Sequence, residues 1–486
     1  MEYQVNGRQP AAMFRYFEDI SAIPRGSGNE KAVSDFVCRF AEERGLSWHQ
    51  DELYNVVVKK PGSKGCETLP PVMLQGHLDM VCEKNADCPH DFEKEGLALE
   101  VCNGFLTAKG TTLGGDNGIA VALMLALLEE DTLRHPPLEC VFTVQEEVGM
   151  IGAAHLDGSL LSARTLINLD SEEEGIATVS CAGGLRMQLS RPASWHSIAG
   201  GVGMRLRIGG LPGGHSGVDI HLERTNANKL MGRLLASLEL PFGLAAVRGG
   251  NKDNAIPREA EALLVFGGEG EYRATAEKLR LLYAELQEEL LPYEPLFSLV
   301  WEQADLPERV LDEATAQALI RLLYLAPDGV LSRNMKQGGF VVSSVNLGVV
   351  RTTDAGVRVV FAPRSSVASR QEEIKQRLAV LAQTLGFTAA CDGEYPGWSF
   401  AEVSPIRERF VKSYQKLFGG ELRLEAIHAG MECGLFQGKL PGLDAIAVGP
   451  TILNCHTPEE KLDLGSCERT WQLLTDVLAG LTEKTV

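Results

Sequence analysis

Two adjacent carboxylates, Glu146 and Glu147, follow a short apolar run and are the first candidates for chemistry in this chain. The run, residues 138–144, is rich in β-branched and aromatic side chains and predicts a buried strand, and Gly149 predicts a turn beyond it. Neighbouring strand residues point to opposite faces, but a chain that leaves the strand can turn both carboxylates toward one cleft. A Glu pair is also typical of a solvated strand end, so its interpretation depends on other residues.

Four further positions carry residue types that bind metal ions. They are His77, Asp116, Asp170 and His456. Zinc and similar ions bind imidazole nitrogen and carboxylate oxygen. In isolation each residue has an ordinary structural explanation, such as a turn, a helix cap or a hydrogen-bonded histidine. Together, beside the predicted strand ends of one domain, they predict a common metal site.

With Glu147, these residues make a set of five that suffices for two ions, which lie about 3.5–4 Å apart when one carboxylate bridges them. We expect Asp116 to be the bridge. His77 and Asp170 would complete the first ion site, and Glu147 and His456 would complete the second. Each ion would then have three protein ligands and would share a water or hydroxide with the other.

Two more carboxylates have expected roles beside the ions. Glu146 is left free to take a proton from the shared water as a general base. Asp79 lies two residues after His77 and is expected to accept a hydrogen bond from that imidazole, which fixes its tautomer. The glycine-rich loop at 110–118 has a second interpretation as a phosphate-binding loop before a helix. It lacks the Gly-Lys-Ser/Thr ending of a P-loop.

Strands alternating with helices surround these residues and predict an α/β domain with a central, mostly parallel sheet. After Gly184 the pattern changes, and a helix at 226–240 and a hairpin at 340–361 predict a separate α+β domain. We expect 1–186 and 399–486 to be the two parts of a catalytic domain and 187–398 to be an inserted domain. No internal repeat is evident.

The composition limits the other classes of function. A formal net charge of -19 and a pI near 5.1 argue against nucleic acid or an anionic membrane as the main partner. The 11 Cys include no CxxC pair, which argues against a disulfide framework and a thiolate zinc site. The start shows no secretory signal, and the longest apolar run, 119–128, is too short to cross a bilayer. We therefore expect a cytoplasmic protein.

Seven motifs occur in an order that resembles the M20 metallopeptidases, and within them the aminoacyl-histidine dipeptidase (cytosol non-specific dipeptidase) branch. They are Gly76-His-Leu-Asp-Met-Val81, Gly110-Thr-Thr-Leu-Gly-Gly-Asp-Asn-Gly118, Glu146-Glu-Val-Gly149, Asn168-Leu-Asp-Ser-Glu-Glu-Glu-Gly175, Gly213-Gly-His-Ser-Gly217, His428-Ala-Gly-Met-Glu-Cys-Gly434, and Gly449-Pro450 through His456-Thr-Pro458. The resemblance covers almost the whole chain and implies the same metal ligands, with Glu146 as general base and Asp79 steering His77. It also implies a two-metal, aminopeptidase-like catalytic domain with an inserted lid that closes over the substrate and mediates a homodimer.

The resemblance implies hydrolysis of dipeptides with a free N-terminal amine, both Xaa-His and broader Xaa-Xaa, by a water that two divalent ions activate. Zn²⁺ is the expected metal, with Co²⁺ or Mn²⁺ as alternatives. Two other functions stay open: an N-acyl amino acid deacylase with the same metal site, and a metal- or peptide-binding protein without catalysis. Glu146 and Asp79 favour catalysis, because binding alone requires neither residue.

Further residues complete the expected site. His215 matches the lid histidine of the family, which in dimeric relatives can reach the partner's active site and stabilise the oxyanion; a structural histidine between glycines is the alternative. Arg364 could hold the substrate's C-terminal carboxylate in a bidentate pair, or lie on the surface. Asn254 is a further substrate-binding candidate. Glu432 could meet the substrate's ammonium group or cap a turn.

Overall fold

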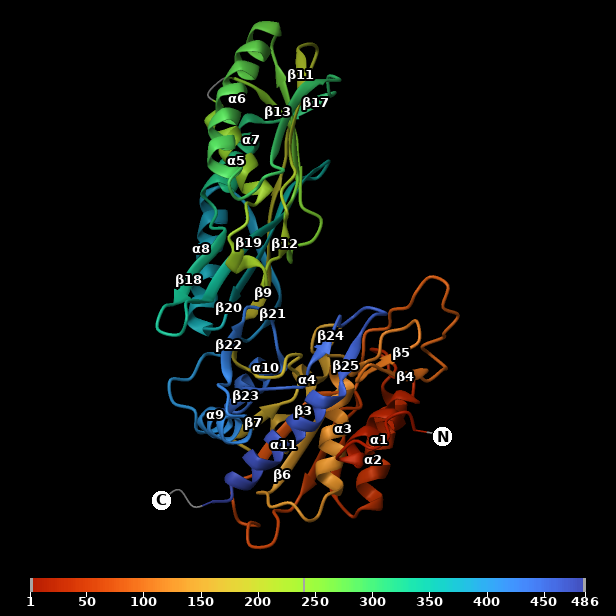
Figure 1. Cartoon of the computed structure of the whole chain (residues 1–486). Helices are drawn as coiled ribbons and strands as arrows, with labels where there is room; N and C mark the ends of the chain where they lie inside the picture. Colours follow the sequence, from red (N-terminus) through yellow and green to blue (C-terminus); the bar gives the residue numbers. More distant parts are fainter. Residues whose placement is uncertain (1–2, 239–240, 484–486) are drawn as a thin grey trace. The chain divides into compact units, whose positions relative to one another are not determined.

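The computed structural model of the chain describes residues 3–238 and 241–483 (Figure 1). The chain divides into two compact units. The first unit comprises Met1–Ser180, Ser399–Ala426 and Met431–Val486, and the inserted unit comprises Cys181–Trp398 and Ile427–Gly430. The sequence-based division had placed 181–186 and 427–430 in the first domain. Residues from 183 onward belong to the inserted unit because they form a strand of its sheet.

The first unit is built on an eight-stranded sheet with the order β1-β2-β6-β3-β7-β23-β8-β22. The strands are β1 (Ser47–Gln50), β2 (Val56–Lys60), β3 (Val72–His77), β6 (Leu138–Thr143), β7 (Thr165–Asn168), β8 (Ile176–Cys181), β22 (Arg423–Ile427) and β23 (Asp444–Ala447). The middle strands β6, β3, β7 and β23 are parallel, as predicted. The pairs β1–β2, β2–β6 and β23–β8 are antiparallel, so the sheet is mixed toward its edges.

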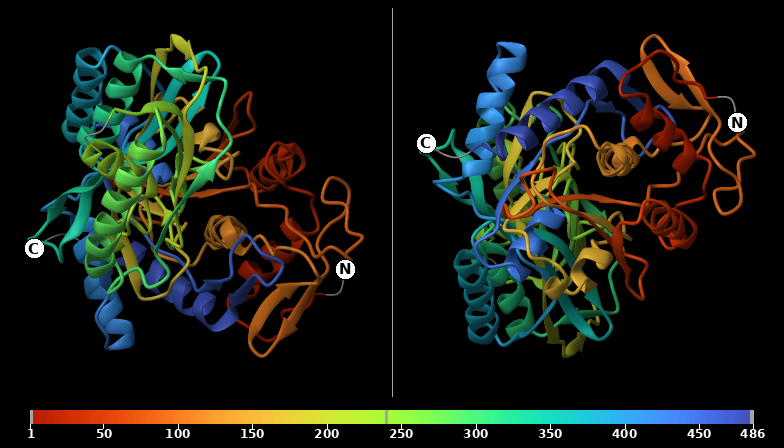
Figure 2. Two further views of the ribbon diagram at one scale, coloured as in Figure 1. Left: turned by 90° about the horizontal axis from the view of Figure 1, so that it is seen from above. Right: turned by 90° about the horizontal axis from the view of Figure 1, so that it is seen from below.

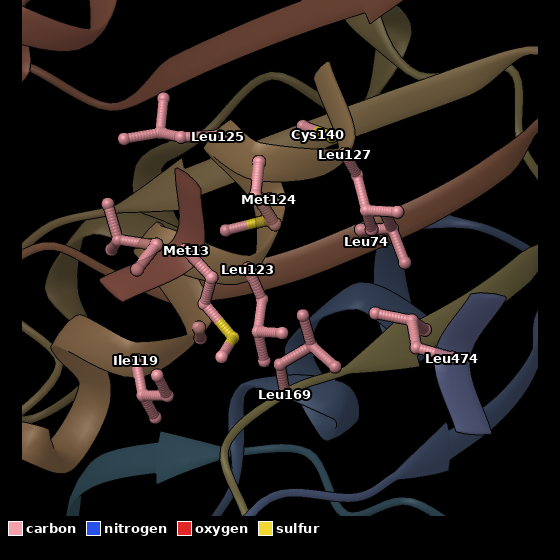
Figure 3. Packing of buried hydrophobic residues seen from close by; sticks show 14 of the residues in the cluster. Met13, Leu74, Ile119, Leu123, Met124, Leu125, Leu127, Cys140, Leu169 and Leu474 are labelled. Atoms are coloured by element: carbon pink, nitrogen blue, oxygen red, sulfur yellow. The ribbon is translucent and has the colours of Figure 1, made fainter. Parts of the chain in front are cut away.

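Helices cover the sheet of the first unit. They are α1 (Ala11–Ser21), α2 (Lys31–Glu43), α3 (Gly115–Glu129), α4 (Ile151–His155), α9 (Pro405–Phe418), α10 (Glu432–Lys439) and α11 (Leu464–Gly480). Residues 115–128 of α3 are all buried, as expected for a helix that is apolar on every side. Figure 3 shows Leu123 and Met124 of α3 beside Met13 of α1 and Leu74 of β3, which belong to one hydrophobic cluster. In Figure 2, α3 (orange) again lies beside the red helices of the first unit.

The sheet order explains why polar residues converge. Strands β6, β3 and β7 are neighbours and parallel, so their carboxyl ends lie at one edge of the sheet. A smaller sheet, β24-β25-β5-β4, adds a loop at 454–460 between its first two strands. Its strands are β4 (Leu99–Cys102), β5 (Phe105–Ala108), β24 (Ile452–Leu453) and β25 (Lys461–Asp463).

The inserted unit contains a nine-stranded sheet, with helices along one of its faces (Figure 1). Its strands are β9 (Gly183–Pro192), β11 (Val202–Gly209), β13 (Gly243–Gly249), β15 (Ala260–Phe266), β16 (Ser298–Ala304), β18 (Gly329–Asn334), β19 (Phe340–Thr353), β20 (Gly356–Ser365) and β21 (Thr388–Tyr395). Two pairs of short strands lie outside this sheet: β10 (Trp195–Ser197) with β17 (Arg309–Leu311), and β12 (Gly214–His215) with β14 (Ala255–Ile256). The helices are α5 (Ala227–Ser237), α6 (Glu269–Leu290), α7 (Glu313–Leu325) and α8 (Ala368–Thr384).

The inserted unit is a structural duplication. The elements β11-α5-β13-β15-α6-β16 follow one another along the chain, and their strands lie in the order β16-β11-β15-β13. The elements β9-α7-β19-β20-α8-β21 repeat this βαββαβ arrangement, with strand order β21-β9-β20-β19. The equivalent strands β13 and β19 pair antiparallel, through Arg248↔Arg351 and Gly249↔Val350. The sequence alone had shown no repeat.

Most predicted elements are present, with shifted ends. The helix expected from residue 119 begins at Gly115, so Asp116 lies in its first turn, with non-helical backbone angles. The helix expected at 226–240 is α5, and residues 239–240 lie outside the described part of the chain. The predicted hairpin at 340–361 corresponds to β19 and β20. Among the described residues, no helix combines the length and apolar character needed to span a membrane.

Candidate metal centre

The predicted ligands of both ion sites come together in the first unit. One possible ligand atom from each of His77, Asp116 and Asp170 lies within 4.8 Å of the other two, and the same holds for Asp116, Glu147 and His456. His77 ends β3, Asp170 follows β7, Glu147 follows β6, and His456 lies in the loop between β24 and β25. Asp116 is common to both groups, which is the position expected of a bridging carboxylate.

The distances between these ligand atoms fit divalent ions. His77 Nε2 lies 3.0 Å from Asp116 Oδ1 and 3.5 Å from Asp170 Oδ1. His456 Nε2 lies 3.1 Å from Asp116 Oδ2 and 3.0 Å from Glu147 Oε1. Tetrahedral ligands about 2.0–2.2 Å from a zinc ion are roughly 3.3–3.6 Å from one another. The two oxygens of Asp116 thus face different imidazoles, as a carboxylate that bridges two ions requires.

Without metal, the centre holds protons instead. Hydrogen bonds to Asp116 and Glu147 raise the pKa of His456 to about 11. Burial alone would lower the pKa of His77, but the carboxylates of Asp170 and Asp116 raise it well above its ordinary value. Metal ligands must be neutral imidazoles and ionised carboxylates. Divalent ions would therefore displace protons from both histidines and take their place as the positive charge of the centre.

Glu146 has the environment of a proton carrier. Burial, together with the nearby carboxylates of Asp170, Glu432 and Glu147 and against the opposing charge of His77, raises its pKa to about 9. Because a cation favours the ionised form, bound metal would lower this pKa toward neutral pH. A carboxylate whose pKa lies near the working pH can both accept and return a proton.

Asp79 holds the histidine and both glutamates. His77 Nδ1 lies 3.1 Å from the backbone carbonyl oxygen of Asp79 and 3.3 Å from its carboxylate, which leaves Nε2 facing the other ligands. The Asp79 carboxylate also accepts hydrogen bonds from the backbone N–H of Glu146 (3.1 Å) and Glu147 (3.2 Å). This second contact was not predicted from the sequence. Through these contacts the buried carboxylate of Asp79 orients His77 at the end of β3 and also Glu146 and Glu147, which follow β6.

Beneath the ligands, a buried row of polar side chains crosses three strands. Gln75 of β3 donates to Thr143 Oγ1 of β6 at 3.1 Å and accepts a 2.6 Å hydrogen bond from Asn168 of β7. Glu432 of α10 accepts hydrogen bonds from both Gln75 and Thr143. All four side chains are fully buried. The row fixes the strands relative to one another two to four residues before the expected metal and catalytic residues.

Replacing Gln75 by Leu should therefore destabilise the protein. Leu fills the space but leaves buried groups of Asn168 and Glu432 without their partner, at an expected cost of about 3 kcal/mol. The expected result is a clearly lower Tm, measured by thermal unfolding monitored by circular dichroism. Gln472→Leu, on the exposed surface of α11, is the matched control. Equal Tm values for the two variants would show that the row contributes nothing to stability.

The candidate residues of the inserted unit form a second group. His215 is half-buried, and its Nδ1 accepts hydrogen bonds from the backbone N–H of Gly217 (3.2 Å) and Val218 (3.1 Å). The proton of the neutral ring must then be on Nε2, which is a donor. Burial, with the charge of Arg364 adding to it, lowers the pKa of His215 and keeps the ring neutral.

Arg364 and Asn254 belong to the two halves of the duplication. Arg364 is buried near the end of β20 and donates from Nη1 to the Tyr395 hydroxyl at 2.9 Å. Its Nε is buried and has no hydrogen-bond partner among the described residues. Asn254 is exposed, and its loop is held by Asn346, which donates to the carbonyls of Asp253 (2.7 Å) and Ala255 (2.9 Å).

Contacts also join these residues within the inserted unit. The backbone N–H of Ser216 donates to the carbonyl of Asn254 at 2.8 Å, which ties the loops of His215 and Asn254 together. A pocket of about 1060 Å³ lies beside them, and its lining includes Gly214, the chain neighbour of His215, and Ala255, the chain neighbour of Asn254. Asn346 and Tyr395 support the group and carried no recognisable signal in the sequence.

The chain matches the model of "Peptidase family M20/M25/M40" over residues 73–480. The chain belongs to this peptidase family. It is 36% identical over 485 residues to the cytosol non-specific dipeptidase of Escherichia coli (strain K12), covering 98% of each sequence. The crystal structure of aminoacylhistidine dipeptidase from Vibrio alginolyticus superposes with a TM-score of 0.94 at 36% identity, covering 98% of this chain and 97% of that one. An aminopeptidase from Bacillus cereus, with a TM-score of 0.56 and 15% identity, shares the fold.

Two further residues of this M20 peptidase support the centre and were not predicted from the sequence. Glu460 and Arg25 are both buried next to the loop that carries Asp116. Glu460 lies only four residues after His456, which was the one available signal. Arg25 lies in a short loop after α1, and nothing in its sequence context indicates a role.

Proposed function

We propose that the protein is a metal-dependent dipeptidase that hydrolyses dipeptides with a free N-terminal amine, including Xaa-His and broader Xaa-Xaa substrates. The observation that carries the proposal is that five side chains suited to metal binding converge beside Glu146, a half-buried carboxylate that the two expected ion sites do not need as a ligand. Two relatives at 36% identity, which align over nearly the whole chain, are named as dipeptidases.

Two divalent ions per chain would be held by His77, Asp116, Glu147, Asp170 and His456, with Zn²⁺ as the expected metal and Co²⁺ or Mn²⁺ as alternatives. When bound, such ions polarise a scissile carbonyl and increase the acidity of a water. The donor set of imidazoles and carboxylates, with no thiolate in either group, supports this assignment.

Glu146 is the proposed general base and acid. Its carboxylate takes a proton from the attacking water and then returns it to the nitrogen of the leaving amine. Asp79 positions it, because the Asp79 carboxylate accepts a hydrogen bond from the backbone N–H of Glu146 and also contacts the His77 ring. One buried side chain thereby keeps the base and an expected ligand in fixed positions.

The proposal assigns the remaining contacts to residues of the inserted unit and to one residue of α10. His215 would donate its Nε2–H to the oxyanion of the tetrahedral intermediate. Arg364 would bind the C-terminal carboxylate of the substrate, since its Nε is buried and lacks a partner among the described residues. Asn254 would contact the substrate beside His215. Glu432 would meet the substrate ammonium group through Oε1, its carboxylate oxygen without a hydrogen-bond partner in the described chain.

We also propose a cytoplasmic homodimer that forms through the inserted unit. The cytoplasmic location is supported by the name of the Escherichia coli relative and by eleven cysteines that are all free thiols in the structure. The dimer is supported by the family resemblance alone. Sedimentation velocity tests it, since a dimer has twice the 52.7 kDa mass of one chain.

The test of the proposed function is a substrate panel. The purified protein, loaded with Zn²⁺, Co²⁺ or Mn²⁺, is incubated with Xaa-His and Xaa-Xaa dipeptides, with N-acetylated versions of them and with tripeptides. We expect cleavage of the free dipeptides and little cleavage of the other two classes. Preferred cleavage of N-acyl amino acids would instead indicate a deacylase. No cleavage of any compound by protein with bound metal would indicate binding without catalysis.

A further inference from the structure

The glycine-rich loop before α3 is enclosed by two buried charged side chains. Glu460 and Arg25 are each 2% exposed, and both contact the backbone at 113–116. Neither belongs to the expected ligands. Buried charges are costly unless they are fully paired, so two of them around one short loop call for an explanation.

The carboxylate of Glu460 binds backbone N–H groups of the loop. Its Oε2 accepts hydrogen bonds from the N–H of Leu113 (2.8 Å) and Gly114 (3.1 Å), and its Oε1 from the N–H of Gly115 (2.8 Å) and Asp116 (3.4 Å). Such charge-assisted hydrogen bonds are roughly twice as strong as neutral ones. Because Glu460 lies in the same loop as His456, its carboxylate joins the loop of one expected ligand to the loop of another.

The guanidinium of Arg25 binds backbone carbonyl groups, one in this loop and two in the segment that follows β3. Its Nη2 donates to the Gly114 carbonyl at 2.5 Å, and its Nη1 donates to the carbonyls of Leu78 (3.0 Å) and Asp79 (3.2 Å). The guanidinium therefore joins the Asp116 loop to the segment that directly follows His77. The five N–H groups of Arg suit contacts with several carbonyls, which the single ammonium of Lys cannot reproduce.

The glycines of the loop leave space for these two side chains. A Cβ atom on Gly114, whose φ is 65°, would collide with Arg25 Nη2, and a Cβ on Gly118 would lie 2.6 Å from the same atom. A Cβ on Gly115 would lie 3.2 Å from Glu460 Oε1. The glycine-rich motif is thus explained by the close approach of two charged groups to the backbone, and a phosphate-binding role is not needed.

We propose that Arg25 and Glu460 are positioning residues that set the bridging carboxylate of Asp116 against the two histidines. The inference rests on the proposed metal centre, and it adds that metal affinity depends on two charges outside the set of ligands. Replacing Glu460 by Gln leaves one accepting oxygen and places an NH2 donor against backbone N–H groups, which weakens the link between the loop of Asp116 and the loop of His456. Changes to groups that orient ligands typically reduce metal affinity or activity 10- to 100-fold.

The test uses full-length protein freed of metal and titrated with Co²⁺, followed by visible absorption. For Glu460→Gln we expect the dissociation constant for Co²⁺ to rise about 10- to 100-fold and the shape of the absorption bands to change. With Zn²⁺-loaded protein, kcat for a dipeptide should fall by a similar factor, while KM changes less. Glu459→Gln, an exposed neighbour, is the matched control and should behave as the unmodified protein.

An unchanged Co²⁺ affinity and spectrum in Glu460→Gln would overturn the proposal, even if its Tm were lower. If that variant does not fold, Arg25→Lys takes its place, with the exposed Arg39→Lys as control. Arg25→Lys should also weaken Co²⁺ binding, and unchanged binding would overturn the proposal as well. If the unmodified protein cleaves no dipeptide, the proposed function fails, but the Co²⁺ titration still decides whether these residues position the ligands.

Discussion

Replacing Glu146 by Ala is expected to reduce kcat for dipeptide hydrolysis about 10²- to 10⁴-fold, the usual contribution of a positioned general base. The carboxylate is half-buried beside the expected ligands. Its partial burial and the neighbouring carboxylates raise its pKa to about 9 in the metal-free protein, so it can exchange a proton once cations lower this pKa. Metal content should stay at the level of the unmodified protein, because the expected ligand groups are complete without Glu146. Steady-state kinetics and elemental analysis of the same sample measure both quantities.

The control for this variant is Glu83→Ala, which removes an exposed carboxylate from the same unit. It should retain normal turnover and metal content. Near-normal turnover in Glu146→Ala would exclude Glu146 as the base. Loss of both metal and activity would show instead that Glu146 is a ligand. The structure allows this alternative, because His77, Glu146 and Glu147 also form a group of possible ligands whose atoms lie close together.

The sequence could indicate the candidate metal ligands because each stands beside a feature that a few neighbouring residues reveal, such as the end of a strand. His77, Glu147 and Asp170 end or follow short apolar strands, and parallel strands present their carboxyl ends at one sheet edge. The prediction therefore depended only on recognising three strands and assuming that they are neighbours. The structure confirms that β6, β3 and β7 are adjacent and parallel.

Arg25 and Glu460, which support the loop of Asp116, could not be predicted because their partners are backbone groups far away in the chain. Glu460 accepts from the N–H of Gly115, which precedes it by 345 residues, and Arg25 donates to the carbonyl of Gly114, which follows it by 89. Backbone groups have no residue type, so such contacts leave no pattern in a single sequence. Glu432 was similarly ambiguous, and the structure shows that one of its oxygens accepts hydrogen bonds from the strand residues Gln75 and Thr143.

The duplication of the inserted unit was hidden for another reason. A βαββαβ arrangement constrains the order of elements and the burial of alternate residues, and many unrelated sequences satisfy these constraints. One half is also inserted into the other, since β11 to β16 lie between β9 and α7 along the chain. The interruption removes the constant spacing by which repeats are recognised in a sequence.

Replacing Asp116 by Asn should have a different signature from that of Glu146→Ala. Asn preserves the size of the side chain but removes the negative charge that both histidines face at 3.0 and 3.1 Å. A neutral amide is also a poor bridge between two cations. We expect the metal content to fall from about two ions per chain to about one or fewer, and turnover to fall at least about 10³-fold, since metal and activity are lost together.

The matched control for Asp116→Asn is Glu172→Gln. Glu172 forms a further group of possible ligands with Asp116 and Cys455, so it tests whether a nearby carboxylate outside the expected set holds metal. Elemental analysis and isothermal titration with Zn²⁺ should show two ions in Glu172→Gln and a deficit in Asp116→Asn. The reverse result would assign the metal to the group of Glu172 and Cys455. Two ions in both variants would mean that Asp116 bridges nothing, and the two-ion centre would need a different carboxylate between its histidines.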